Sequence, residues 1–357
     1  MRKKPFATIR DVARLASVSV ATVSGVMNKK AVARPEVQKR VEEAMKALDY
    51  HPDRMARSLK TGLSKVIGMV VPDLKNPFFV DLMCGVEEVA RASGFSVIFS
   101  NSNKDQALEK ENLSMLYSHR VAGAVVCSTD AYTAYDSSMT RRFPMVFVDR
   151  LPVVGFKGRA VTVDNRRAAY KATRHLIELG HQDIAIIAGR MDLSGGFERV
   201  EGFREAMQEA HLPIREEYFQ SGDFSLASGY TCTLKLLSLP QRPTAIFSSN
   251  NNMTLGLMQA LTDRNLSSPA DISVLSYDDF PWAGYFHPKL TAVAQPGLEM
   301  GRRAVHMLQD AIQAGGEPLG EELVVLEAEL IIRESTASPA NRSVKDVLPE
   351  RTHAVTK

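Results

Sequence analysis

The chain has 357 residues, which is enough for two or three domains of ordinary size. Hydrophobic residues make up 45% of the chain and charged residues 24%, a balance that excludes a wholly disordered protein. No apolar run reaches the ~20 residues of a membrane-spanning helix, and the basic N-terminal segment lacks the apolar stretch of a secretory signal. We therefore expect a cytoplasmic protein, whose widely spaced Cys84, Cys127 and Cys232 are buried and reduced.

Positive charge is concentrated at the N-terminus. Residues 1–65 hold 15 Lys or Arg and 6 Asp or Glu, a net charge of +9, although the whole chain carries only +3. The remaining residues are therefore acidic overall. A compact basic segment on an acidic body is typical of a module that binds a polyanion such as DNA, although a solvated basic surface would look the same.

Three short helices are predicted within residues 5–62. Thr8 is a suitable N-cap, and Ile9, Val12, Ala13 and Ala16 follow at helical spacing. A turn leads to Ser19, a second N-cap, and to a helix over about 20–27. A third helix starts at Pro35, a residue favoured at the first helical position. Two short helices joined by a tight turn in a basic segment predict a helix-turn-helix.

Beyond residue 62, strand-like runs alternate with helical stretches. Continuous apolar strands between helices predict parallel sheets covered on both faces, here two doubly wound α/β lobes. In such folds ligands bind beyond the carboxyl ends of the strands. Strands are expected at 66–71, 95–100, 121–127, 145–148, 184–188, 244–248 and 272–276, and helices at 79–93, 106–119, 166–179, 198–210, 226–237 and 253–264.

No catalytic, metal or cofactor motif is present, so we expect neither an enzyme nor a bound cofactor. Gly195 and Gly196 lack the spacing of a dinucleotide fingerprint and are interpreted as a loop. His181 follows Gly180 and is expected in a turn that ends a helix rather than in a ligand site.

The segments TIRDVARLASVSVATVSGVMN and VEEAMKALDYHPDRMARSLKTG resemble the head and hinge of the LacI/GalR (lactose-repressor) family of bacterial transcription regulators. Shorter motifs continue the resemblance to about residue 335. It implies a helix-turn-helix head and a two-lobed body like that of periplasmic sugar-binding proteins. It also implies a homodimer that binds double-stranded DNA at a palindromic operator, most simply as a repressor.

The resemblance also implies domain boundaries. The head covers 1–52, a hinge helix 53–62, and the effector-binding and dimerisation core 63–338. The first lobe takes about 63–164 and 295–325, and the second about 165–294 and 326–338. The polar tail, 339–357, has no leucine heptads and is expected to be disordered.

DNA contacts are expected from the head and the hinge. This chain has Gly25 where relatives carry a large polar base-reading residue, so direct readout is weakened and the hinge gains importance. Leu59 would be wedged into the central base step from the minor groove. The residues implied are Thr8, Ser19, Val20, Ala21, Thr22, Ser24 and Asn28 in the head, and Arg54, Arg57, Leu59 and Lys60 in the hinge.

The resemblance also implies, motif by motif, which residues contact the effector. Asn251 departs from the family, which usually has Asp at that position. The residues implied are Phe78 and Phe79 from NPFF, Asp149 and Arg150 from VFVDR, Arg199 from RVEGF, Phe224 from GDF, Asn250 from SSNNN, Asp278 from SYDD, and Gln295.

The effector class stays open between a sugar, a sugar acid and a sugar phosphate. Purine-sensing relatives carry Arg at the position of Leu193 and Trp at that of Arg150, which disfavours a purine. Two arginines also allow a carboxylate or phosphate. The alternatives are a family member whose corepressor is a phosphorylated carrier protein and, in a different class, a solute-binding protein. Whether the effector releases or promotes DNA binding is left open.

Overall fold

The computed structural model describes residues 7–27, 34–50, 64–129, 143–151, 158–315 and 320–339. The chain divides into two compact units between Ser64 and Lys65, and each unit is described by itself.

The N-terminal unit contains α1 (Ile9–Leu15), α2 (Val20–Met27) and α3 (Pro35–Ala47). Each helix places one fully buried valine in a shared core, from Val12, Val23 and Val41. The three helices therefore form where the apolar spacing predicted them.

Local hydrogen bonds define the starts of the first two helices. The Asp11 carboxylate accepts from the Thr8 backbone N–H at 2.9 Å and from the Thr8 hydroxyl at 2.7 Å, and these bonds lower the pKa of Asp11. Ser17 adopts a left-handed φ of 53° in the turn. The Ser19 hydroxyl then accepts from the Thr22 N–H at 3.1 Å, which caps α2.

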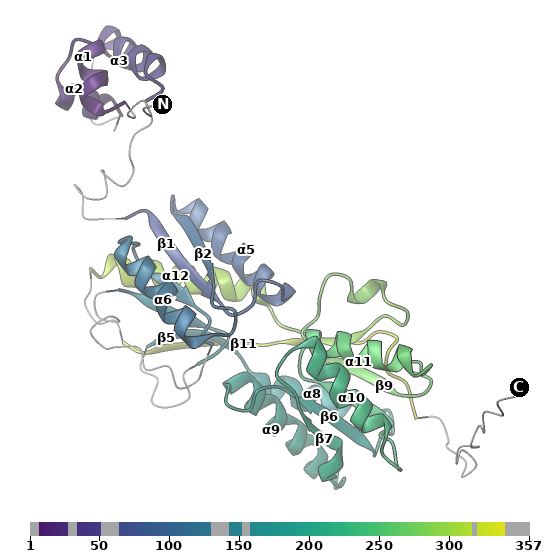
Figure 1. Ribbon diagram of the computed structural model, residues 1–357. Coiled ribbons are helices and arrows are strands. Elements are labelled where there is room, and N and C mark those ends of the chain that lie inside the picture. The colour runs from purple at the N-terminus through teal and green to yellow at the C-terminus, as the bar shows by residue number, and fades with distance from the viewer. Residues whose placement is uncertain are drawn as a thin grey trace, which may run out of the picture. The chain divides into compact units, whose positions relative to one another are not determined.

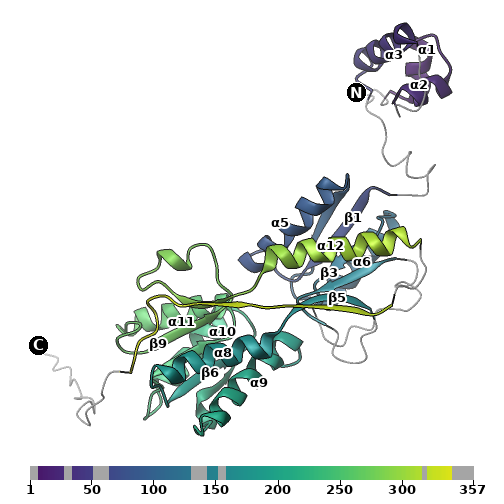
Figure 2. The same cartoon turned by 180° about the vertical axis from the view of Figure 1, so that it is seen from behind.

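The described residues of the second unit form two six-stranded sheets (Figures 1 and 2). The first is parallel throughout, in the order β11-β5-β4-β3-β1-β2. The second, β12-β10-β9-β8-β6-β7, is parallel except for β12. The first sheet contains β1 (Val66–Val71), β2 (Ser96–Asn101), β3 (Ala124–Val126), β4 (Met145–Val148), β5 (Arg159–Val163) and β11 (Glu322–Leu326). The second contains β6 (Ile184–Ala188), β7 (Phe219–Ser221), β8 (Ala245–Ser248), β9 (Ser273–Tyr277), β10 (Thr291–Ala294) and β12 (Glu329–Ile331).

Helices cover both faces of each sheet. Alternation along β6 shows the principle, because Ile184 and Ile186 pack under one helix pair and Ala185 and Ile187 under the other. The first lobe carries α5 (Pro77–Ala92) and α12 (Gly297–Gln313) on one face and α6 (Gln106–Ser118) on the other. The second carries α8 (Asn165–Glu178) with α9 (Ser194–Glu209), and α10 (Leu226–Leu237) with α11 (Asn251–Asp263). Short 3-10 helices lie at Glu216–Tyr218 and Ala283–Tyr285.

The described chain crosses between the lobes between β5 and α8, between β10 and α12, and between β11 and β12. Figure 2 shows β11 and β12 in yellow as an extended run along both lobes. These three crossings are short chain segments, and each lobe has its own hydrophobic core. The lobes can therefore change their relative orientation without disturbing either core.

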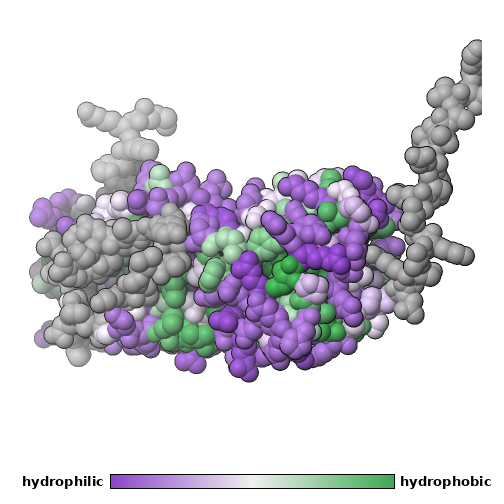
Figure 3. Space-filling view, turned by 90° about the horizontal axis from the view of Figure 1, so that it is seen from below, coloured by the Kyte–Doolittle hydropathy of each residue, from purple (hydrophilic) through white to green (hydrophobic). Residues whose placement is uncertain are grey.

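No helix among the described residues is long and apolar enough to cross a membrane. The face of the molecule drawn in Figure 3 is mostly hydrophilic and is interrupted by smaller hydrophobic areas.

Two sequence expectations, for the pair of glycines before Phe197 and for Cys84, need correction. Gly195 and Gly196 are not a loop, because α9 already begins at Ser194. A side chain at Gly196 would meet the Arg190 carbonyl oxygen at 2.0 Å, so glycine permits close packing of the helix start. Cys84 on α5 is exposed rather than buried, whereas Cys127 and Cys232 are buried as expected. His181 follows Gly180 in the predicted turn, where Gly180 has a φ of +97°.

The expected order of strands and helices in the body is confirmed, with shifts of one to four residues at most element ends. Apolar periodicity did not predict β5, β7, β10, β11, β12 or α12. The strands among them are only three to five residues long. Such short runs carry little periodic signal.

Candidate functional site

A pocket of about 460 Å³, counting its open mouth, lies between the lobes at the carboxyl ends of the strands. All nine residues expected to contact an effector line it, so distant parts of the sequence meet where the resemblance placed them. Their contact with an effector stays a prediction. The lining consists of Asp73, Asn76, Phe78, Phe79, Lys104, Asp149, Arg150, Leu193, Gly195, Gly196, Arg199, Phe224, Asn250, Asn252, Asp278 and Gln295.

Three pocket residues adopt backbone conformations that are uncommon for residues other than glycine. Asp149 directly follows β4 and has a φ of 68°, and Asp278 directly follows β9 and has a φ of 67°. Phe224 has a φ of 66°. Such left-handed conformations cost ~1–3 kcal/mol each and cluster at functional sites. Glycine would avoid the strain but would remove the two carboxylates and the ring from the pocket.

Asp278 is a buried carboxylate at the floor of the pocket. Burial raises the pKa of Asp278, and the nearby Arg199 guanidinium opposes this rise. Gln295 donates to Asp278 Oδ1 through Nε2 at 2.6 Å. The other amide atom of Gln295, Oε1, is buried and has no hydrogen-bond partner. It is available to a ligand that donates a hydrogen bond.

Arg199 on α9 is only 5% exposed, and two of its guanidinium nitrogens donate hydrogen bonds to residues of the second lobe. Nε donates to Asn165 Oδ1 at 2.9 Å, and Nη1 donates to the Ser249 carbonyl at 2.7 Å. Its Cζ lies 3.7 Å from the centroid of the Tyr277 ring. The Tyr277 hydroxyl also donates to Asn165 Oδ1, at 3.0 Å. Asn165 and Tyr277 therefore orient Arg199, a role that sequence reasoning missed.

Two aromatic rings from opposite lobes form the walls of the pocket. Phe79 belongs to α5 in the first lobe, and Phe224 precedes α10 in the second. A side chain at Gly189 would lie 1.9 Å from the Phe224 ring, so this glycine leaves the space that the ring fills. Arg150 Cζ lies 5.8 Å from each ring centroid.

Asp149 is held from two sides. Arg150 Nε lies 3.3 Å from Asp149 Oδ2, and the Cys127 thiol donates to the same oxygen at 3.5 Å. Burial raises the pKa of Cys127 well above its usual value, so this thiol stays protonated and remains a donor.

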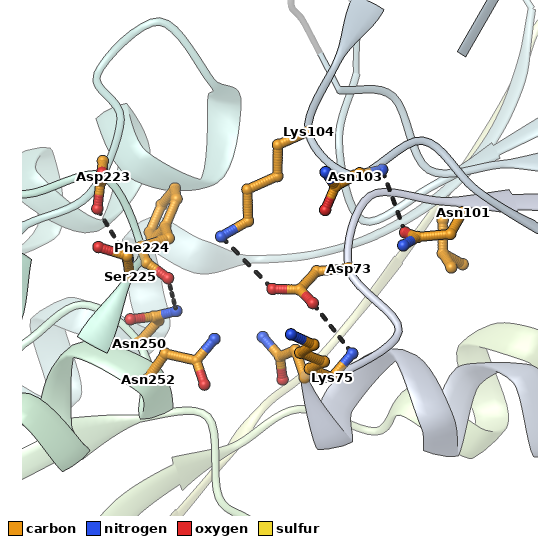
Figure 4. A network of polar contacts seen from close by, with 12 residues as sticks. Asp73, Lys75, Asn101, Asn103, Lys104, Asp223, Phe224, Ser225, Asn250 and Asn252 are labelled. Carbon is orange, nitrogen blue, oxygen red and sulfur yellow. Dashed lines mark hydrogen bonds and ion pairs between the residues drawn. The ribbon is translucent and has the colours of Figure 1, made fainter. Parts of the chain in front are cut away.

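Figure 4 shows the polar mouth of the pocket, where Phe224 and Asn250 lie near Asp73, Lys104 and Asn252, three lining residues that the sequence analysis did not name. Lys104 Nζ lies 3.4 Å from Asp73 Oδ2, and both side chains come from loops of the first lobe. Asn250 Nδ2 donates to the Phe224 carbonyl at 3.3 Å, while its Oδ1 accepts from the Met253 N–H at 2.9 Å. Asn250 therefore caps α11 and fixes the loop of Phe224, besides facing the pocket.

Among the described residues, hydrogen bonds join the two lobes around the pocket. Asn251 Nδ2 donates to Asn76 Oδ1 at 2.9 Å, and Arg190 Nη1 donates to the Thr129 carbonyl at 3.3 Å. The Leu151 N–H donates to Ser194 Oγ at 3.4 Å. The described structure is thus an arrangement in which the lobes contact each other around the pocket.

The residues of the head that are expected to contact DNA differ in their exposure to solvent. Ser19, Val20 and Ala21 are exposed at the start of α2, with Val20 41% exposed, while Val23 is completely buried. Thr22 and Ser24 are half-buried, and Thr8 is exposed at the start of α1. An exposed first turn is the part of a recognition helix that enters the major groove. Asn28, Arg54, Arg57, Leu59 and Lys60 lie outside the described residues.

Within the described residues, no group of three or more His, Cys, Asp or Glu side chains could hold a metal ion. The ring nitrogens of His181 are hydrogen-bonded to the Thr244 and Ser273 hydroxyls and to the Ala337 carbonyl oxygen.

Comparison with known proteins covers almost the whole chain. Residues 8–53 match the family model described as bacterial regulatory proteins, lacI family, and residues 173–336 match that of a periplasmic binding protein-like domain. The HTH-type transcriptional repressor PurR of Actinobacillus pleuropneumoniae serotype 3 (strain JL03) is 36% identical, over 92% of this chain and 98% of that protein.

Solved structures agree with these matches. The Lac repressor dimer bound to operator and the anti-inducer ONPF has a TM-score of 0.81 and 28% identity, covering 94% of this chain and 100% of that chain. The complex of the transcriptional regulator CelR with cellobiose has a TM-score of 0.69 and 28% identity, covering 92% and 100% respectively.

Proposed function

Because the chain belongs to the lacI family of bacterial regulatory proteins, we propose that its interlobe pocket binds a sugar or sugar derivative that controls operator binding. The chain is a DNA-binding transcriptional repressor controlled by a small-molecule effector. Its relatives are repressors rather than enzymes or transport proteins, which confirms the sequence prediction of a regulator.

The observation that carries the sugar proposal is the composition of the pocket. Asp149, Arg199 and Asp278 converge between the rings of Phe79 and Phe224. Sugars have apolar ring faces that pack on aromatic rings and hydroxyl edges that bond to carboxylates and guanidinium groups. The unpartnered Gln295 Oε1 adds an acceptor for a ligand hydroxyl.

Two further observations support a sugar over a purine. Leu193 and Arg150 both line the pocket, and these are the positions at which purine-sensing relatives are expected to carry Arg and Trp. The relative CelR has been solved in complex with cellobiose. The relatives named PurR are a reason to include purine bases in any ligand screen.

The proposal extends to the assembly that binds DNA. A homodimer on a palindromic operator, acting in the cytoplasm, is supported by the similarity to the Lac repressor dimer bound to its operator. Exposed apolar residues of the second lobe, including Trp282 at 46% and Tyr285 at 82%, offer surface that a partner subunit would cover. A ligand touching both lobes would favour their closed arrangement and so bias the spacing of the two heads.

The test combines a thermal-shift screen with operator binding. Sugars, sugar acids, sugar phosphates and purine bases are screened first, because a ligand at 100 times its Kd adds ~2.7 kcal/mol of stability. Operator affinity is then measured by fluorescence anisotropy on a duplex selected from a random library, with and without the ligand found.

Arg199→Ala and Asp278→Asn should each abolish the ligand response while leaving operator binding without ligand intact, because neither residue is in the head. Arg215→Gln, which removes a guanidinium that pairs with Asp183 away from the pocket, serves as the control. A purine as the only stabilising ligand would overturn the sugar proposal. An unchanged response in both pocket variants would reassign control to another surface, as for a protein corepressor.

A further inference from the structure

Lys104 enters the mouth of the pocket from a strained turn between β2 and α6. Asn103 and Lys104 adopt consecutive left-handed conformations, with φ of 50° and 61°. The Asn103 N–H donates to Asn101 Oδ1 at 3.2 Å, and Asp105 caps α6 by accepting from the Ala107 N–H at 2.7 Å. Left-handed conformations of residues other than glycine cost free energy and persist where the surrounding structure fixes them. The turn therefore holds the backbone of Lys104 at a fixed place beside the pocket.

The Lys104 ammonium lies between acidic groups of the two lobes. In the first lobe, Nζ is 3.4 Å from Asp73 Oδ2, while Asp73 Oδ1 accepts from the Lys75 N–H at 3.0 Å. Figure 4 shows the Lys104 side chain extending from the first lobe toward the loop of Asp223 and Ser225 in the second. The side chain of Asp73 is only 18% exposed, so the anchored end of this contact is largely shielded from water.

Asp223 belongs to the loop that carries the Phe224 wall. Its Oδ1 accepts from the Ser225 N–H at 2.9 Å, and its own N–H donates to Ser228 Oγ at 3.2 Å. Partial burial acts to raise the pKa of Asp223, but hydrogen bonds from Ser225 and Ser228 and the charge of Lys104 act against it, so the pKa lies below its usual value. Asp223 is therefore ionised at neutral pH and interacts with Lys104 across the gap between the lobes.

The sign of the electrostatic force across the mouth depends on Lys104. Asp73 and Asp223 carry the same charge and would repel each other as the lobes approach. An ammonium between them turns this repulsion into attraction, because its three N–H donors are enough for both carboxylates. Asp223 is exposed in the described arrangement, so closer approach would shield the contact and strengthen it.

We propose that Lys104 is a positioning residue for lobe closure, whose ammonium, anchored on Asp73, binds Asp223 of the second lobe when the lobes close over the pocket. Because Asp223 directly precedes Phe224, the same contact places the aromatic wall of the second lobe. The inference rests on the proposed function, since it specifies how the effector pocket closes.

A direct contact between Lys104 and the effector is the alternative, because Lys104 lines the pocket. Asp223 separates the two roles, since it is not among the described residues that line the pocket. A contact with the effector makes Lys104 matter only when ligand is bound. An interlobe contact makes the effects of Lys104 and Asp223 depend on each other even without ligand.

The experiment measures the distance between the lobes in the full-length, ligand-free protein. Spin labels are attached through Ser114→Cys on α6 and Gln208→Cys on α9, two exposed and uncharged positions, in a chain that also carries Cys84→Ser because Cys84 is exposed. Labelled chains are mixed with an excess of unlabelled chains, so that pulsed electron paramagnetic resonance reports distances within one subunit. The ratio of the shorter to the longer distance population is the readout.

Lys104→Gln and Asp223→Asn should each lower this ratio by about two- to fivefold, the scale of a partly exposed ion pair. The double variant should be no lower than either single variant, because both changes remove the same contact. Lys104→Arg keeps the charge and should restore most of the ratio. Lys289→Gln, which removes a lysine paired with Glu334 inside the second lobe, is the matched control and should resemble wild type.

Salt gives an independent readout. Raising the salt concentration from about 50 mM to about 500 mM should lower the ratio in wild type but not in the double variant, because ions screen exposed charges. Circular dichroism and melting confirm that each variant is folded.

The interlobe role is overturned if Lys104→Gln leaves the distances unchanged, or if the effects of Lys104→Gln and Asp223→Asn simply add. Either result leaves the sugar proposal intact, because no ligand is present. Conversely, a screen in which no sugar stabilises the protein would end the sugar proposal without changing the measured distances.

Discussion

Asn251, the first residue of α11, donates a 2.9 Å hydrogen bond to Asn76, the N-cap of α5, and so joins the second lobe to the first at the mouth of the pocket. Asn76 Oδ1 also accepts from the Phe78 N–H at 3.0 Å, which fixes its orientation. The resemblance to the family implies an Asp at the position of Asn251, and its carboxylate would face the Asn76 side-chain oxygen instead of donating to it. The asparagine found here instead supplies the N–H that closes the contact.

We predict that Asn251→Ala weakens effector binding by about three- to tenfold, because a typical hydrogen bond contributes ~0.5–1.5 kcal/mol. Since that bond exists only when the lobes meet, its loss favours their separation. Calorimetric titration with the ligand found in the screen measures the effect. Asn112→Ala removes an amide bond to the Asn101 carbonyl inside the first lobe and should leave the affinity unchanged. Equal losses in the two variants would argue against an interlobe role.

The head should be required for DNA binding and dispensable for effector binding. We predict that a chain starting at residue 63 loses operator affinity completely but retains the thermal shift with ligand, since the chain divides into separate compact units near Ser64. Binding of the intact protein should weaken steeply with salt, because the basic residues displace counterions from DNA. Anisotropy titrations between 50 and 200 mM salt, chosen as roughly the range over which such effects appear, measure the slope. Residual specific binding by the truncated chain would contradict the assignment of the head.

Leu59 lies outside the described residues, and its role as a minor-groove wedge remains a prediction. Leu59→Ala should lower specific affinity by a few kcal/mol while largely preserving non-specific affinity, because only the specific complex contains the kinked base step. Competition with random duplex DNA gives the ratio of the two affinities. The wedge would be disproved by a ratio equal to that of wild type.

His181 links the last described residues to the second lobe, and it makes stability depend on pH. Its Nε2 lies 2.8 Å from the Ala337 carbonyl oxygen, and its Nδ1 lies 2.8 Å from Thr244 Oγ1. Burial lowers the pKa of His181 below its usual 6.5. The unfolded chain therefore takes up the proton first as the pH falls. Stability should be unaffected above the unfolded pKa and should decrease below it, by up to ~1.4 kcal/mol per pH unit until the folded pKa is reached.

Thermal unfolding between pH 7.5 and 5.5, spanning about one unit on each side of the unfolded histidine pKa, measures this dependence. Burial lowers the pKa of His175 as well, so His181→Gln should reduce the dependence and His175→Gln with His181→Gln should remove most of it. His211→Gln, with its histidine outside this contact, is the control. A double variant with the same slope as wild type would assign the dependence to other groups.

Much of the pocket could be predicted because its residues follow strands. Asp149 and Asp278 directly follow the apolar runs of β4 and β9, and parallel strands bring their carboxyl ends to one edge of a sheet. Asn165, Tyr277 and Asn76 were not predicted, although they orient Arg199 or join the lobes. Their roles depend on contacts between residues as distant as Asn76 and Asn251, and no local pattern records such contacts.

The sequence by itself determined the local elements and their order, because helix caps, apolar spacing and basic charge act between neighbouring residues. It therefore predicted the three helices around Val12, Val23 and Val41 and the alternation of strands and helices in the body. Tertiary structure alone decided that Gly195 and Gly196 form the first turn of α9, where the Arg190 carbonyl approaches too closely for any side chain at Gly196. It also decided that Arg150 lies between rings of opposite lobes. Both outcomes depend on chain segments that are separate in the sequence and close in space. Their approach leaves no room for a side chain at Gly196 and removes the Arg150 guanidinium from water.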